Sequence, residues 1–244
     1  KGASMQKRPT QTRELRPRFL IVCEGKQTEP NYFKSFRVNA DVEVFGKGRS
    51  PQGVVEYAQK LRRKSEYTHV WVVFDRDEFS AEEFNAAIEQ AKKQDIGAAY
   101  SNEAFELWYV LHFDFCDTAQ ARQSYQATLT EKLGSPYRKN AVGLYESLRN
   151  RQPQAIANAQ RLLEIYQPNH NPAVNNPRTT VHLLVMPLNQ HLAYTEDEFS
   201  LLPFSAEKGV FYAKTNEYNF RICRFSPTHF LEALCSKSAT SVLA

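Results

Sequence analysis

The chain has 244 residues, of which 42% are hydrophobic, and its formal net charge is +4 at pH 7. The length fits one domain, or a domain with an appendage, and the apolar content is enough for a core, which excludes a wholly disordered chain. The sequence contains no apolar run of about 18 residues and no apolar signal segment at its start. We therefore expect neither a membrane span nor secretion, and we expect a cytoplasmic protein.

The first 17 residues are rich in lysine and arginine, and we expect them to form a basic N-terminal tail. Residues 1–4 precede Met5 and look like a cloning remnant, so Met5 is the expected natural start. The positive charge is compatible with a polyanionic partner, although a solvated basic tail would have the same composition.

Between residues 18 and 115, short apolar runs alternate with amphipathic stretches, a pattern that is typical of a parallel α/β sheet. The expected strands are the runs at 19–23, 41–45, 70–74 and 96–100. Polar residues that cap helices mark the expected helix starts, at Thr28, Ser50, Ser80 and Ser101. We therefore predict an α/β fold with a mostly parallel four-stranded sheet flanked by helices.

The pattern changes to helices without clear strands between residues 116 and 192, which predicts a helical region packed on the first domain. The expected helices lie at 120–133, 143–150 and 154–166, with a last one that begins at Asn176 and bends at Pro187. Residues 193–244 form a C-terminal extension whose structure the sequence leaves open. Within it, segments 211–213 and 219–225 could form a terminal β-hairpin.

Carboxylates stand at the ends of two expected strands. Glu24 directly follows the first strand, and Asp75 and Asp77 follow the third. Because side chains alternate along an extended segment, Asp75 and Asp77 point to one side. Open α/β sheets bind ligands at the carboxyl ends of their strands, and carboxylate oxygens suit Mg²⁺ or Mn²⁺ better than zinc. An isolated D-x-D is typical of a solvated turn, but together with Glu24 it predicts a Mg²⁺ (or Mn²⁺) site.

Several ordered motifs resemble those of the RloB-like family of prokaryotic defence proteins. They extend over about residues 18–190 and lie around Glu24, Thr28, Asp75, Ser101, Glu106, His112, Tyr137 and Asn176. The resemblance implies a Toprim-type fold, in which a glutamate after the first strand and a D-x-D after a later strand hold Mg²⁺ for phosphodiester chemistry. It also implies a nuclease of an anti-phage, abortive-infection system, gated by a partner ATPase of the RloA-like, AAA/ABC type.

The family's three metal-binding positions are all carboxylates in this chain, but two nearby positions depart from its pattern. Lys26 and Gln27 replace an acidic residue followed by a basic one, and Glu103 replaces a proline. These departures affect the expected contacts with substrate and leave the three carboxylates in place. The sequence has no Walker A pattern, so we expect nucleotide hydrolysis to belong to the partner.

Further acidic residues could support the site. Glu106 lies among aromatic residues of the helix expected after Ser101, so it needs a partner if it is buried, and we expect it to assist catalysis or a second metal ion. Glu24 could act as a general acid or base instead of a metal ligand. Glu29 could stabilise a helix N-terminus or support the metal. We expect His112 to bond a carbonyl at a helix end.

A nucleic acid that approaches a carboxylate cluster needs cationic contacts beside the metal. The candidate substrate-binding residues are Lys26, Arg138, Lys139 and Arg178. We expect the helices between residues 120 and 190 to form a wall of the cleft that turns the last three of these residues toward the acidic site. The same residues could instead form a solvated surface, and the choice between RNA and DNA stays open.

Two other functions fit parts of the pattern. Asp75 and Asp77 also match the nucleophile and acid of a haloacid-dehalogenase-like phosphatase, but that class places them after the first strand. A non-catalytic effector-binding or docking module would keep the fold and use the pocket for a ligand, and the departure at Lys26 is compatible with it.

Overall fold

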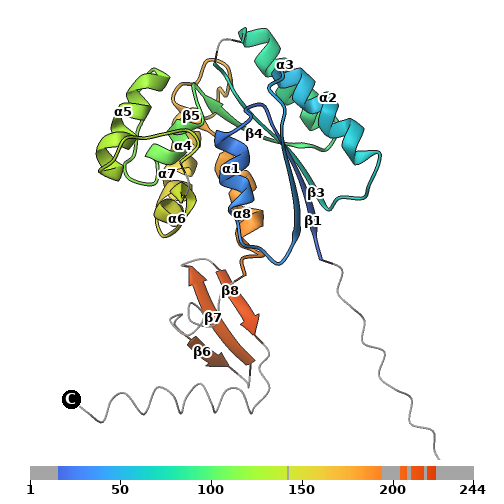
Figure 1. Ribbon diagram of the computed structural model, residues 1–244, viewed down its shortest axis with the longest axis vertical. Helices are drawn as coiled ribbons and strands as arrows, with labels where there is room; N and C mark the ends of the chain where they lie inside the picture. Colours follow the sequence, from blue (N-terminus) through green and yellow to red (C-terminus); the bar gives the residue numbers. More distant parts are fainter. Residues whose placement is uncertain are drawn as a thin grey trace, which may run out of the picture.

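The computed structural model describes residues 16–77, 79–141 and 143–193, and the backbone of three strands beyond them (Figure 1). The strands up to residue 193 are β1 (Arg18–Cys23), β2 (Asp41–Gly46), β3 (His69–Asp75), β4 (Gly97–Asn102) and β5 (Arg178–Thr179). The helices are α1 (Thr28–Lys34), α2 (Pro51–Arg62), α3 (Ala81–Lys93), α4 (Glu106–Val110), α5 (Arg122–Leu133), α6 (Leu144–Arg149), α7 (Gln152–Ile165) and α8 (Val181–Asn189).

The central sheet has the strand order β2-β1-β3-β4-β5. The first four strands are parallel and match the four that the sequence predicts, while β5 pairs antiparallel with the end of β4. The sheet therefore has five strands. The predicted number of four is wrong, because it omits β5. A strand of two residues is too short to produce a hydrophobic period. The mostly parallel α/β architecture is confirmed and is consistent with a Toprim-like fold.

Helices cover both faces of this sheet (Figure 1). On one face α2 and α3 bury alternate strand residues, namely Leu20, Val22, Val72 and Phe74. The other face packs against α1, α4 and α8 and buries the residues between them, namely Phe19, Ile21, Cys23 and Val73. Because strand side chains alternate, each strand delivers its last residues to a defined face at the carboxyl edge.

Two predicted helix starts differ from the structure. Ser101 and Asn102 do not cap a helix: they extend β4, because each pairs with a residue of β5, and the following helix begins only at Glu106. Thr28 is the first residue of α1 rather than its cap, and Gln27, which precedes it, makes no capping side-chain bond.

The other start signals are confirmed. Ser50 caps α2 with Pro51 in its first turn. Ser80 and Glu83 form the reciprocal capping box of α3, in which each side chain accepts from the backbone N–H of the other residue. These local bonds satisfy the amide groups that the first turn leaves free.

The region after residue 116 is mostly helical, as predicted. Helices α5, α6 and α7 match the expected positions within two residues, whereas α8 begins five residues after Asn176 because β5 intervenes. Strands β6 (Phe204–Glu207), β7 (Val210–Asn216) and β8 (Asn219–Cys223) form an antiparallel sheet, and the predicted terminal hairpin corresponds to β7 and β8. In the described part of the chain, no helix has the length and apolar character needed to cross a membrane.

Candidate functional site

The carboxyl ends of β1 and β3 bring Glu24 and Asp75 together. These strands are parallel neighbours, and the Glu24 N–H donates to the Val73 carbonyl at 2.8 Å, which continues their pairing past β1. Asp75 is the last residue of β3 and is only 6% exposed. The Glu24 carboxylate accepts a hydrogen bond from the Asp75 backbone N–H at 3.2 Å. The predicted proximity of these residues is confirmed.

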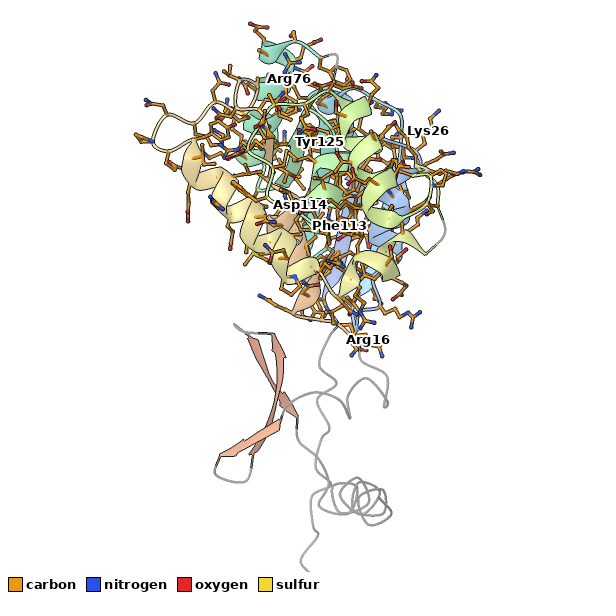
Figure 2. The ribbon with its side chains drawn as sticks, turned by 90° about the vertical axis from the view of Figure 1, so that its left-hand side faces the viewer. Arg16, Lys26, Arg76, Phe113, Asp114 and Tyr125 are labelled. Carbon is orange, nitrogen blue, oxygen red and sulfur yellow. The ribbon has the colours of Figure 1, made fainter. Side chains whose placement is uncertain are left out.

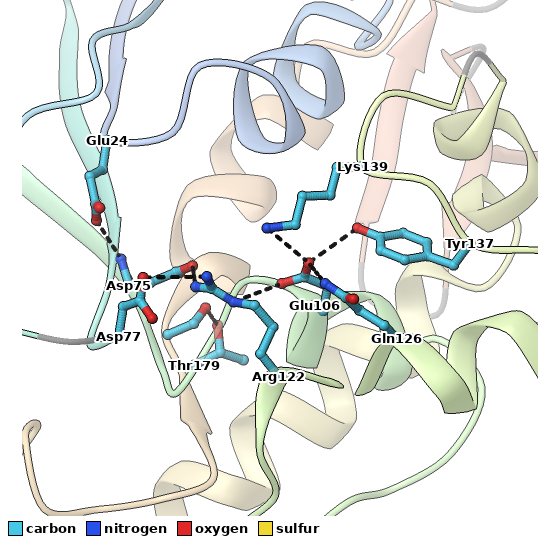
Figure 3. Close-up of polar contacts among 10 residues, drawn as sticks. Glu24, Asp75, Asp77, Glu106, Arg122, Gln126, Tyr137, Lys139 and Thr179 are labelled. Carbon is cyan, nitrogen blue, oxygen red and sulfur yellow. Dashed lines mark hydrogen bonds and ion pairs between the residues drawn. The ribbon is translucent and has the colours of Figure 1, made fainter. Parts of the chain in front are cut away.

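Asp77 lies in the turn that follows β3 and has a positive φ of 34°, a conformation that aspartate tolerates better than most residues. Its N–H donates to the Glu103 carbonyl at 3.3 Å. Its carboxylate lies on the same side as that of Asp75, since one guanidinium group contacts both (Figure 3).

That guanidinium belongs to Arg122, the first residue of α5. Its Nη2 lies 3.2 Å from Asp75 Oδ2, and its Nη1 lies 3.3 Å from Asp77 Oδ2. Its Nε is 3.9 Å from Glu106 Oε2 (Figure 3). Arg122 was not among the predicted site residues, because an arginine in a polar helix start has the pattern of a solvated residue. Only the fold brings α5 over the ends of the strands.

Glu106, at the start of α4, is 2% exposed and has several polar partners. Its Oε1 accepts from Gln126 Nε2 at 3.1 Å and from the Tyr137 hydroxyl at 3.5 Å, and Lys139 Nζ lies 3.9 Å away. The partners that a buried polar residue requires are therefore present. Lys139 faces the acidic site, as the sequence analysis expected (Figure 3).

Glu29 is a fifth carboxylate of this cluster and is 6% exposed. Its carboxylate lies close to Gly25, where an added Cβ would overlap it, so a larger residue at position 25 would force the Glu29 side chain to move. Burial raises the pKa of Glu29, its bond to its own backbone N–H lowers it, and Glu106 raises it further. Glu29 therefore meets a condition of each expected role: it bonds a backbone N–H at the start of α1, and it lies beside the acidic site.

The cluster carries more negative charge than its basic side chains balance. Burial raises the pKa of Glu24 to about 7, although the hydrogen bond from the Asp75 backbone N–H acts to lower it. Burial, followed by the charges of Glu29 and Glu24, holds the pKa of Asp75 well above its usual range despite the nearby guanidinium. Because both shifts disfavour the charged form, the site would gain stability from additional positive charge.

The donor chemistry fits a divalent cation. Asp75 Oδ1 is buried and has no hydrogen-bond partner, although its other oxygen contacts Arg122. Carboxylate oxygens that converge at low solvent exposure are the ligands that Mg²⁺ and Mn²⁺ prefer. Within the described residues, no three Asp, Glu, His or Cys side chains are already gathered with metal-ligand spacing. The shared site of Glu24, Asp75 and Asp77 therefore stays a prediction.

The residues that form the carboxylate cluster lie within a region that matches a known protein family. The model of the family described as RloB-like protein matches residues 19–188. The chain belongs to the RloB-like family. The match extends from β1 into α8 and includes all the residues of the carboxylate cluster. Comparisons with curated proteins and with solved structures find no match.

The other basic residues that the sequence analysis selected do not join the cluster of this RloB-like protein. Arg178, in β5, is 3% exposed, and its guanidinium lies near Tyr100 and Tyr166, whose hydroxyl groups partly offset the lowering of its pKa by burial. The predicted position of Arg178 beside the acidic site is therefore wrong. The adjacent residue Thr179 points to the acidic side instead, because side chains alternate along the strand (Figure 3).

Lys26 and Arg138 are exposed, and Figure 2 shows the position of Lys26. Neither makes an ion pair with a residue in the described part of the chain, so both remain available to an anionic ligand. His112 is 1% exposed, and its Nδ1 donates to the Trp108 carbonyl at 2.9 Å, which confirms the predicted bond to a helix carbonyl. Burial lowers the pKa of His112 to about 4. This histidine is therefore neutral at pH 7 and lies outside the carboxylate cluster.

Proposed function

We propose that this RloB-like protein is a Mg²⁺- or Mn²⁺-dependent nuclease that hydrolyses phosphodiester bonds. The observation that carries the proposal is the partly buried carboxylate cluster at the carboxyl edge of the sheet, where the pKa values of Glu24, Glu29 and Asp75 are raised. A protein that keeps unfavourable charge buried at a ligand-binding edge does so for function more often than for stability.

Asp75, Asp77 and Glu24 would hold the cation. When bound, it would supply Lewis-acid stabilisation of charge on the phosphate and help to activate water. In its alternative role, without contact to the cation, Glu24 has its pKa near 7 and is suited to accept a proton from water and to return it near neutral pH. Lys139 faces the cluster from the opposite wall and would contact a phosphate oxygen.

Family membership and the lack of a Walker A pattern support a proposal for the biological setting. We propose that the nuclease acts on RNA or DNA in an anti-phage, abortive-infection response and that it works in the cytoplasm. A partner ATPase, RloA-like and of the AAA/ABC type, would supply nucleotide hydrolysis and gate the cleavage. The exposed basic residues Lys26 and Arg138 would then add to the contacts with the polyanion.

One observation favours a second candidate, a non-catalytic module that binds an effector. Arg122 already contacts Asp75 and Asp77 and approaches Glu106, so a guanidinium partly neutralises the cluster without any metal. In such a module the cluster would hold Arg122 in place and would order α5. The haloacid-dehalogenase alternative has less support, since its aspartate pair would follow the first strand and here it follows β3.

A cleavage panel tests the proposal. Transfer RNA, single-stranded RNA, single-stranded DNA and duplex DNA are incubated with the protein in Mg²⁺, in Mn²⁺ and in EDTA, and a phosphatase substrate is included. We expect cleavage of at least one nucleic acid that requires the metal and is abolished in Asp75→Asn. The matched control is Asp114→Asn, because Asp114 pairs with Lys132 outside the cluster.

The outcomes separate the candidates. Cleavage that survives EDTA, or equal loss of activity in both variants, contradicts a metal site at Asp75. Release of phosphate without strand cleavage favours the phosphatase. A protein that cleaves nothing, alone or with its partner ATPase, supports the effector-binding module.

A further inference from the structure

A cavity of about 290 Å³ opens beside the Glu106 end of the carboxylate cluster. It lies between α1, α4 and the residues 139–141 and 143–145. Tyr32 and Tyr109 form its buried floor, and the exposed side chains of Asn31, Lys34, Lys139 and Asn140 line its opening. Apart from Lys139, the residues that line this cavity have no part in the proposed catalysis.

The cavity and the cluster share a wall. Lys139 lines the cavity, and its Nζ lies 3.9 Å from Glu106 Oε1. Tyr109 also lines it, and its hydroxyl donates to the Thr28 carbonyl at 3.5 Å, one residue before Glu29. A ligand that occupies the cavity would therefore place one end next to the carboxylates.

The lining has the chemistry that a nucleotide requires. Aromatic residues provide an apolar floor for a base, and the amide groups of Asn31 and Asn140 can both donate and accept hydrogen bonds at base edges. Lys34 and Lys139 supply positive charge for a phosphate. The volume lies at the small end of the range for ligand pockets, which fits one nucleotide rather than a stretch of duplex.

We propose that this cavity binds a single unpaired nucleotide of the substrate, so that the protein selects single-stranded nucleic acid. The inference rests on the proposed nuclease function and deepens it. The base enters the cavity, Asn31 and Asn140 contact its edge, and Lys139 holds the adjoining phosphate near the carboxylates. A base within a duplex would first have to leave its stack, which makes duplex binding less favourable than single-strand binding.

The test measures binding without cleavage. Fluorescence anisotropy follows labelled single-stranded and duplex oligonucleotides with the full-length protein in EDTA. We expect single strands to bind more tightly than duplexes of the same length. Each of Asn31→Ala and Asn140→Ala should weaken single-strand binding about fivefold, as expected for one lost hydrogen bond. Lys139→Gln should weaken it and reduce the salt dependence by about one charge.

Matched controls separate recognition from folding and from general charge. Lys92→Gln removes an exposed lysine on α3, which covers the opposite face of the sheet, and should leave binding unchanged. The asparagine variants should also keep the wild-type Tm and Mn²⁺ affinity. Wild-type binding in the asparagine variants, equal binding of duplexes and single strands, or no binding at all would overturn the inference.

The results also distinguish this inference from the proposed nuclease function. Single-strand binding that depends on Asn31 and Asn140, in a protein that cleaves nothing, supports the cavity and contradicts the nuclease. Metal-dependent cleavage that the two asparagine variants retain, with unchanged binding, supports the nuclease and contradicts the cavity.

Discussion

Replacing Arg122 with glutamine tests whether the carboxylate cluster needs positive charge. The substitution keeps most of the side-chain length but removes the guanidinium that contacts Asp75 at 3.2 Å and Asp77 at 3.3 Å. If the cluster is a metal site, this variant should be destabilised in metal-free buffer and should gain more stability than wild type from a divalent cation.

The magnitude follows from burial. Arg122 and Asp75 side chains are 25% and 8% exposed, which places the pair between an exposed ion pair worth about 0–1 kcal/mol and a buried one whose disruption costs about 3–5 kcal/mol. Partial protonation of Asp75, whose pKa is already raised by burial, would reduce the loss of stability in the variant. We therefore expect Arg122→Gln to lower the free energy of unfolding by about 2 kcal/mol.

The assay is chemical denaturation in EDTA and at several Mn²⁺ concentrations, with Mn²⁺ affinity measured by calorimetry. A cation at 100 times its Kd stabilises the folded state by about 2.7 kcal/mol, enough to offset the lost pairing. Arg122 competes with the cation for Asp75 and Asp77, so we expect the variant to bind Mn²⁺ more tightly. Arg63→Gln, at an exposed position after α2, is the matched control.

Unchanged stability in EDTA together with unchanged Mn²⁺ affinity would show that the cluster does not need the positive charge of Arg122 and that Arg122 does not compete with a cation. A loss of stability that no concentration of Mn²⁺ restores would show that Arg122 has only a structural role and would favour the non-catalytic module.

Three further predictions concern single side chains, and denaturation in EDTA measures their stability effects. Asp75→Asn and Asp77→Asn should abolish cleavage but change the free energy of unfolding by no more than about 1 kcal/mol, because they also relieve like-charge crowding; a larger loss in both would make these residues structural. Glu24 has its pKa raised from 4.5 to about 7 in the folded state, so stability should fall by about 3 kcal/mol as pH rises between these values, and Glu24→Gln should remove that fall. If Glu24→Gln has the same dependence of stability on pH as wild type, Glu24 does not cause the fall. His112 has its pKa lowered from 6.5 to about 4, so its contribution is intact above pH 6.5 and is lost, by about 3 kcal/mol, as pH falls toward 4. The His112→Asn variant should lose less stability than wild type as pH falls. An equal loss in both would show that another group causes it.

The sequence was sufficient to predict the elements whose signals are local. The four parallel strands are six or seven residues long and contain their apolar residues as short runs or in alternation, and Ser80 with Glu83 forms a helix start that depends on neighbouring residues alone. The approach of Glu24 to Asp75 was also predictable, because parallel strands end at one edge of a sheet.

Features that depend on tertiary contact were not predictable. β5 exists because Ser101 and Asn102 provide a partner for Arg178 and Thr179 across more than seventy residues, and this pairing replaces the helix start predicted at Ser101. Arg178 points away from the cluster because of its register on that strand. Arg122 reaches the cluster only because α5 packs beside α4, which its own polar pattern does not reveal.

Anomalous diffraction from crystals soaked in Mn²⁺ tests the central claim most directly, because it locates the cation without reference to activity. If the carboxylates hold a cation, we expect an anomalous peak about 2 Å from a carboxylate oxygen of Asp75, with Asp77 or Glu24 as a further ligand and Arg122 displaced. A fully soaked crystal with no peak at the carboxyl ends of β1 and β3, and with Arg122 still in contact with Asp75 and Asp77, would contradict it.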